Sequence, residues 1–193
     1  RRVSVQLTAE QQLVEDIAGF THDPLGYALY CFPWGMKGTE LENKRLRSWQ
    51  REVLDGIGQR LRSGVVDLGE VIREATAAGH GIGKSALVSM LIKWAMDTRE
   101  DTRGVITANT EKQLLTKTWP ELSKWHRMSL TAHWATLTAT AMISNAAGHD
   151  KTWRIDAVSW SEHNTEAFAG LHNEGKRLLL VFDEASAIAD KVW

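Results

Sequence analysis

Hydrophobic residues recur at helical spacing in several segments of the chain. Thr8 and Gln11 match the capping-box pattern, which predicts a helix over residues 9–20. The apolar residues around 48–62 form one broad stripe and predict a second helix there: Leu46, Val53, Leu54, Ile57 and Leu61. Residues 85–96 (SALVSMLIKWAM) are mostly apolar and lack Gly and Pro, which predicts a buried helix.

A further helix is expected after residue 110. Thr110 and Gln113 form a second capping box, so the helix is predicted to end near His126. One side of it is apolar and comprises Leu114, Leu115, Trp119, Leu122 and Trp125. The opposite side is basic and comprises Lys112, Lys117, Lys124 and Arg127. These cations form either a solvated surface or a face that follows nucleic-acid phosphates.

Short β-branched or apolar runs predict the strands of an α/β fold. We expect strands over 71–78, 104–108 and 178–182, within a mainly parallel sheet flanked by helices. The run LLLVF at 178–182 is expected to be buried on both faces. Threonine and alternating apolar residues between 129 and 161 predict two or more further strands, joined by a turn at 147–150.

The remaining segments define the predicted domain organisation. Residues 22–38 are rich in Pro and Gly and are expected to form a loop with one extended piece at 27–32. Residues 164–171 fit a short helix or an ordered loop. We expect an N-terminal appendage of helix and loop over 1–45, followed by an α/β domain over 46–193.

The segment AGHGIGKS at 78–85 carries the strongest chemical signal. Glycines can take left-handed conformations that turn several backbone N–H groups toward one anion, and here they stand at 79, 81 and 83. His80, Ile82 and Ala86 complete the loop and the start of the helix. Lys84 can then reach the β and γ phosphates of a nucleotide, and Ser85 can ligate Mg²⁺.

The loop departs from the pattern G-x-x-x-x-G-K-[ST] at one position, where Ala78 replaces the first glycine. A strand before the loop and a helix after it still favour a P-loop, because the helix N-terminus then faces the phosphates. The alternative is a glycine-rich turn before an ordinary helix.

An acidic pair follows the last predicted strand. Asp183 is placed to hold Mg²⁺, and Glu184 to orient or deprotonate the attacking water. Ligands bind at the carboxyl ends of the strands in a parallel α/β sheet, so this pair can meet the glycine loop. The alternative reading of an acidic pair at this position is a helix N-cap.

Gln50 places a polar amide on the apolar stripe of the helix at 48–62. A buried amide needs hydrogen-bond partners. It therefore either bonds to backbone groups or reads the edge of a ligand.

Composition narrows the function classes. The chain has 193 residues and a formal net charge of −1, so no overall basic field captures nucleic acid. Its single cysteine, Cys31, rules out an internal disulfide and fits a reducing compartment. No apolar run spans a bilayer, and no zinc-binding spacing occurs. We expect a soluble intracellular protein, and the start at Arg1 and the end at Trp193 favour a fragment of a longer chain.

Together these residues resemble the ATPase domain of phage terminase large subunits, the motors that package viral DNA. The resemblance rests on AGHGIGKSAL (78–87) as Walker A, ITANTEKQLLTKTWPEL (106–122), EAFAGLH (166–172) and LLLVFDEASAI (178–188) as Walker B. RSWQRE (47–52) is similar to the adenine-reading Q motif, which favours a ligand-binding role for Gln50.

The resemblance implies a P-loop NTPase of the additional-strand, catalytic-glutamate type that hydrolyses ATP with Mg²⁺. Lys84 and Glu184 are its implied catalytic residues. The implied partners are double-stranded viral DNA, a small terminase subunit and a portal on the prohead, with the active motor a homo-oligomeric ring. A phage or prophage protein of this kind works in the host cytoplasm and needs no membrane.

Two features depart from this family. Terminase motors continue into a coupling motif and an RNase H-like nuclease domain, and the chain stops before both. A gap or an exposed sheet edge is therefore expected beside the Walker B strand. The arginine that offsets charge on the γ-phosphate is Arg73, Arg103 or a residue of a neighbouring subunit.

Two alternative functions remain open at this level. One is a helicase-like P-loop ATPase that acts on nucleic acid without a prohead. The other is a nucleotide-binding interaction module, in which ATP stabilises a docking surface without turnover.

Overall fold

A five-stranded sheet forms the centre of the fold. The computed structural model describes residues 7–66, 70–77, 81–108, 110–159 and 173–183. The strand order is β2-β3-β4-β1-β5. The strands are β1 (Arg103–Ala108), β2 (Ala135–Leu137), β3 (Ala141–Ser144), β4 (Arg154–Ala157) and β5 (Leu178–Asp183). The predicted α/β class is confirmed, as are the strands near 104–108 and 178–182.

The sheet is mixed, so the prediction of a mainly parallel sheet was wrong. β1 pairs in parallel with β4 and β5, whereas β3 pairs antiparallel with β2 and β4. The cause is the short connections between residues 135 and 157, because antiparallel strands can be joined by tight turns but parallel strands need a long crossover. The turn expected at 147–150 is one of these connections.

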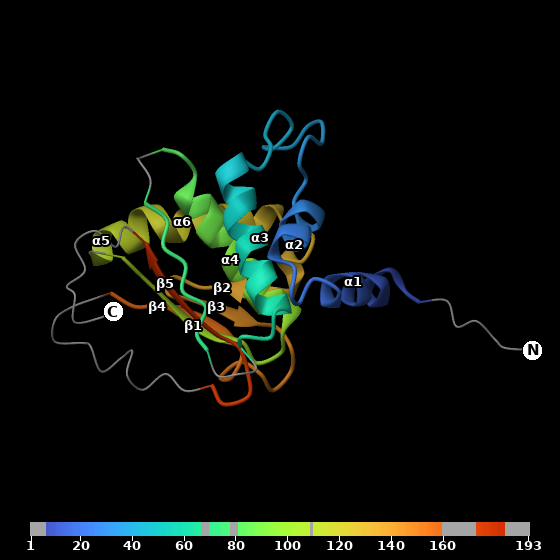
Figure 1. Ribbon diagram of the computed structural model, residues 1–193, viewed down its shortest axis with the longest axis vertical. Helices are drawn as coiled ribbons and strands as arrows, with labels where there is room; N and C mark the ends of the chain where they lie inside the picture. Colours follow the sequence, from blue (N-terminus) through green and yellow to red (C-terminus); the bar gives the residue numbers. More distant parts are fainter. Residues whose placement is uncertain (1–6, 67–69, 78–80, 109, 160–172, 184–193) are drawn as a thin grey trace, which may run out of the picture.

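The longer helices gather on one side of the sheet (Figure 1). They are α1 (Ala9–Ala18), α2 (Pro24–Cys31), α3 (Ser48–Arg62), α4 (Lys84–Thr98) and α6 (Trp119–Met128), with a 3₁₀ turn at Ala132–Trp134. The helices expected at 9–20, 48–62 and 85–96 are confirmed. Both hydrogen bonds of the Thr8–Gln11 capping box are formed. None of the described helices is long and apolar enough to cross a bilayer.

Helix α2 replaces the extended piece expected at 27–32. The Asp23 side chain accepts a hydrogen bond from the Gly26 N–H, and Pro24 occupies the first helical turn, so both features start a helix. Tyr27, Ala28 and Cys31 are all buried. Their spacing of one, three and four residues is that of a helical face, which a short window rich in Pro and Gly concealed.

The helix expected after residue 110 is present but contains a wide turn. It runs as α5 (Glu111–Gln113), a π-helical segment (Leu114–Thr118) and α6, and Thr110 caps its start. The predicted apolar side is buried except for Leu115, which is 38% exposed. The placement of Leu115 on the core side was therefore wrong, because the π-helical turn alters the angular spacing of the residues.

Helix α4 lies between two hydrophobic clusters. Its Met90 and Trp94 pack with α1, α2 and α3 residues such as Ile17, Tyr27 and Leu54. Its Ile92 and Met96 belong to a second cluster, with sheet and α6 residues such as Ile106, Leu122 and Met142. The prediction of a buried helix is confirmed, and residues 17–41 share a core with α4.

Strand β5 lies at one edge of the described sheet. Leu179 and Val181 pack toward the core, while Leu178 and Leu180 on the other face are 38% and 41% exposed. The expectation of burial on both faces was wrong, because an edge strand is covered less than a central one.

Residues 70–77 have no regular secondary structure, so the strand expected at 71–78 is not found in its described part. Side-chain contacts hold this segment instead of a ladder. Arg60 donates a 2.8 Å hydrogen bond to the Arg73 carbonyl and pairs with Glu74. Within the described residues, β5 is the last strand on its side of the sheet, and the segment 70–77 does not pair with it.

A buried ion pair ties α4 to α2 and to the residues after α6. Lys93 Nζ lies 3.1 Å from the Asp97 carboxylate, and the two side chains are 0% and 3% exposed. Tyr27 donates a 2.6 Å hydrogen bond to Asp97, and Thr131 donates to it as well. The Thr131 carbonyl accepts from Lys93 at 3.3 Å. Each buried charge thus has several polar partners, as burial requires.

Replacing Asp97→Ala is expected to lower the free energy of unfolding by about 3–5 kcal/mol, because Lys93 is left buried without its counter-ion. The matched control is Asp55→Ala, whose partner Arg62 is 3.6 Å away and half exposed, and a loss below about 1 kcal/mol is expected there. Urea unfolding measures both. Equal losses for the two variants would contradict a structural role for the buried pair.

Candidate functional site

The glycine loop enters α4 through left-handed backbone. Gly81 has φ of 74° and Gly83 has φ of 92°, and Gly83 is the residue immediately before the first turn of α4. Only glycine takes such angles without strain. The first N–H groups of a helix have no partner within it, so they point a positive end at the loop. Lys84 and Ser85 are the first two residues of this helix.

Gln50 binds the loop from α3. Its Nε2 donates a 2.9 Å hydrogen bond to the Gly83 carbonyl, and its Oε1 accepts one of 3.0 Å from the Arg47 N–H. The side chain is 5% exposed. Of the two interpretations of Gln50, the structure shows bonding to backbone. One of the two backbone partners belongs to the glycine loop itself.

The loop and the last strand meet at Ser85 and Asp183. Ser85 Oγ lies 3.4 Å from Asp183 Oδ2, although the residues are 98 positions apart. Asp183 ends β5 and is 5% exposed, and its neighbour in register on β1 is Ala108. The meeting follows from topology, because the carboxyl ends of the parallel strands β1, β4 and β5 lie at one edge of the sheet.

Thr118 is a site residue that the sequence analysis missed. Its Oγ1 donates a 2.6 Å hydrogen bond to Asp183 Oδ2, and its side chain is buried. A signal was available, since Thr118 lies four residues after Leu114 and four before Leu122 on the apolar stripe. A hydroxyl on a buried stripe needs a partner, by the argument that singled out Gln50.

The donor set suits a magnesium nucleotide. Mg²⁺ prefers oxygen ligands such as a serine hydroxyl and a carboxylate, and these are the groups that Ser85 and Asp183 bring together. A helix N-terminus preceded by glycines in left-handed conformation is a ready anion site. A Cβ on Gly83 would lie 2.9 Å from Gln50 Nε2, so the loop tolerates no larger residue there without movement.

The other predicted site residues divide into two groups. Ile82, Lys84 and Ala86 lie in the loop and in the first turn of α4, beside the residues above. Gly79, His80 and Glu184 lie outside the described residues, as does Ala78.

The fold also places the two arginines that were candidates for contacting the γ-phosphate. Arg103 begins β1 opposite Leu178, whereas Asp183 lies at the far end of β5. Five residues of strand put roughly 16 Å between these levels, so Arg103 was a wrong candidate for the γ-phosphate. Arg73 is exposed and lies in the segment 70–77, which has no regular secondary structure.

Comparison with known proteins adds a distant relationship. No family model matches the chain. Over 171 residues it is 26% identical to "Probable terminase, large subunit" of Enterobacteria phage P7, covering 86% of this chain. The chain spans about a third of the length of that relative, 32%. This similarity supports a terminase-like family for the chain.

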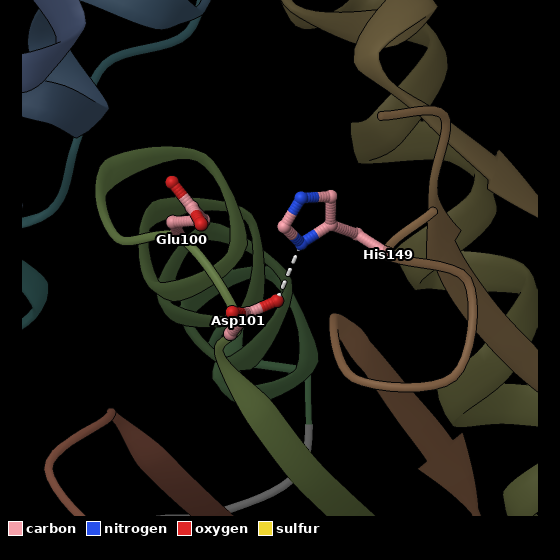
Figure 2. A group of neighbouring side chains, drawn as sticks. All are labelled: Glu100, Asp101 and His149. Carbon is pink, nitrogen blue, oxygen red and sulfur yellow. Dashed lines mark hydrogen bonds and ion pairs between the residues drawn. The ribbon is translucent and has the colours of Figure 1, made fainter. Parts of the chain in front are cut away.

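A second group of possible ligands lies at the opposite end of the sheet. Glu100, Asp101 and His149 come within reach of one cation at the start of β1 and in the turn before β4 (Figure 2). His149 Nδ1 is already 2.7 Å from Asp101 Oδ1, and Lys176 Nζ lies 3.4 Å from Asp101 Oδ2. The nearby ammonium group repels a cation, so this cluster is an ion-pair network.

The pair Asp101–His149 has a defined pH range. Its hydrogen bond raises the pKa of His149, and the same bond with His149 and a second one from Thr152 lower the pKa of Asp101 to about 2. Because the pKa of His149 is raised in the folded state, its ion pair stabilises the fold fully below the unfolded pKa of about 6.5. This stabilisation is lost as the pH rises through the folded pKa. A lowered carboxyl pKa stabilises above about 3.9 and is lost as pH falls toward 2.

The stability advantage of the native chain over His149→Gln is therefore expected to be largest between about pH 4 and 6.5 and to shrink by pH 9. Thermal unfolding of both chains across this range measures it. An advantage that grows from pH 6 to pH 9 would contradict the ion pair.

Gly83→Ala is expected to destabilise the chain more than Gly148→Ala. Both glycines have positive φ, which costs alanine about 1–2 kcal/mol. A Cβ at Gly148 meets nothing within 4 Å, but at Gly83 it meets Gln50 Nε2. Chemical denaturation measures the excess, which is expected to fall in a Gln50→Ala background. An excess that persists undiminished in that background would argue against the Gln50 contact as its cause.

Proposed function

We propose that this chain is the ATPase domain of a terminase-like motor, which hydrolyses Mg-ATP to drive double-stranded viral DNA into a prohead. The observation that carries the proposal is the contact of Ser85 with Asp183, beside a loop whose Gly83 is left-handed. Walker A and Walker B residues must meet in this way to hold a magnesium nucleotide. The similarity to a phage protein named as a terminase large subunit supports the choice of motor.

In this proposal the backbone does most of the phosphate binding. The N–H groups of residues 81–85 would donate to the phosphates, and the N-terminus of α4 favours negative charge. Lys84 contacts the β and γ phosphates and offsets the charge that develops during transfer. Gly79, His80 and Ala86 complete the binding loop.

The carboxylates and the hydroxyl organise the reaction. Ser85 and Asp183 are the residues that would hold Mg²⁺, which would supply positive charge to offset the charge of the phosphates. Glu184 orients the attacking water and accepts its proton.

Gln50 connects the base site to the loop. Both ends of its amide are used, by Arg47 and Gly83. One N–H and one lone pair of the amide remain for an adenine edge, so base recognition and loop conformation would be linked through one side chain. This role extends the resemblance of residues 47–52 to an adenine-reading motif.

The partners follow from the function of a packaging motor. We propose that the full protein acts as a homo-oligomeric ring with double-stranded DNA, a small terminase subunit and a portal. Lys112, Lys117 and Arg127 are exposed along one helix and can follow DNA phosphates. DNA-stimulated ATP hydrolysis would separate such a motor from a module that only binds nucleotide.

Lys84→Ala is expected to reduce ATP hydrolysis by at least about tenfold, because removing a charge from the developing transition state costs a few kcal/mol. Glu184→Gln is expected to abolish turnover but to keep ATP binding, because it removes the base and leaves the phosphate loop intact. Phosphate release and nucleotide binding measure the two effects.

The control is Lys44→Ala, an exposed lysine on the loop before α3, which is expected to leave both quantities unchanged. Hydrolysis at the native rate by Lys84→Ala would reject the assignment. Loss of nucleotide binding in Glu184→Gln would reject the role of this glutamate as the base.

A further inference from the structure

Thr118 connects the helix after β1 with the carboxylate at the end of β5. It is 3% exposed and lies at the last position of the π-helical segment Leu114–Thr118. Its 2.6 Å bond to Asp183 Oδ2 joins residues 65 positions apart. The same oxygen lies 3.4 Å from Ser85 Oγ, so Thr118 makes the closer of the two hydroxyl contacts.

Packing alone does not explain a hydroxyl at this position. Leu114 and Trp119 are buried beside Thr118 in the helix, and both belong to the core cluster under the sheet. Valine has nearly the same shape and would avoid the cost of burying a hydroxyl group. The hydroxyl is compensated by a charged acceptor, and such charge-assisted bonds are about twice as strong as neutral ones.

The wide helical turn marks the same place. π-Helical turns are rare and often occur at functional sites, because they trade a regular hydrogen bond for a particular side-chain position. In this helix the π-helical segment ends at the residue that touches Asp183. Two independent features, an irregular backbone and a buried polar contact, therefore coincide at Thr118.

We infer that Thr118 is a positioning residue that orients the Asp183 carboxylate toward Ser85 for a divalent cation bound with the nucleotide. The inference rests on the proposed function. Groups that hydrogen-bond to metal ligands fix the ligand direction, and their removal typically weakens metal affinity by about 10–100-fold.

The test is a magnesium titration of the whole chain at fixed ADP, read as the ligand-induced rise in unfolding temperature. Thr118→Val is expected to raise the Mg²⁺ concentration for half-maximal stabilisation by about 10–100-fold. Thr118→Ser keeps the hydroxyl and is expected to stay within a few-fold of the native chain.

Thr102→Val is the matched control for loss of a buried hydroxyl. Thr102 is fully buried at the other end of β1 and donates to the carbonyls of Ala95 and Arg99 at 2.8 and 2.7 Å. This variant is expected to lower the unfolding temperature without ligand but to keep the native Mg²⁺ dependence.

The outcomes distinguish the positioning role of Thr118 from the proposed function. Thr118→Val with the native Mg²⁺ dependence would overturn the positioning role and leave the proposed function standing, even if the variant is less stable without ligand. No response of the native chain to ADP and Mg²⁺ would overturn both. Failure of Thr118→Ser to restore the native dependence would also reject the role of the hydroxyl.

Discussion

Helix α4 packs on two hydrophobic clusters at once, and this double burial limits the freedom of its first residues. Met90 and Ile92 are both fully buried, and burying each such side chain contributes about 1.5–3 kcal/mol. The far end of the helix is also held, since Arg177 donates to the Ala95 carbonyl and stacks 4.1 Å from the Trp94 ring. A shift of α4 would disturb both clusters. Gly83 and Ser85 therefore stand at a position that the core defines.

The two ends of the parallel strands have different chemistry. At the carboxyl end, Asp183 meets hydroxyl groups from α4 and from the helix after β1, and a helix N-terminus lies beside it. Groups of these types are the ones that anions and divalent cations prefer. At the opposite end, Asp101 forms ion pairs with His149 and Lys176. These pairs link the connections that lead into the strands. One end holds the fold together, and the other presents groups for a ligand.

Local patterns predicted most helices, because a cap or an apolar stripe is written in neighbouring residues. The capping pairs Thr8–Gln11 and Thr110–Gln113 each marked a helix start. Helix α2 was missed because Pro24 and Gly26 resemble a loop, although Asp23 caps it. The mixed sheet and the exposed face of β5 were missed for another reason. Strand direction depends on connection length, and burial of a strand depends on which elements cover it.

The order of residues along the chain was enough to identify the chemical groups of the candidate site: the glycines before α4, Lys84, Ser85, and the acid that follows an apolar strand. It also marked Gln50 as a polar group on a buried face. The three-dimensional fold was needed to show that Gln50 bonds to Gly83, that Ser85 comes within 3.4 Å of Asp183, and that Thr118 donates to the same carboxylate. The reason is physical. Residue types follow local spacing, but contacts between residues 65 or 98 positions apart arise only when strand register and core packing bring their elements together.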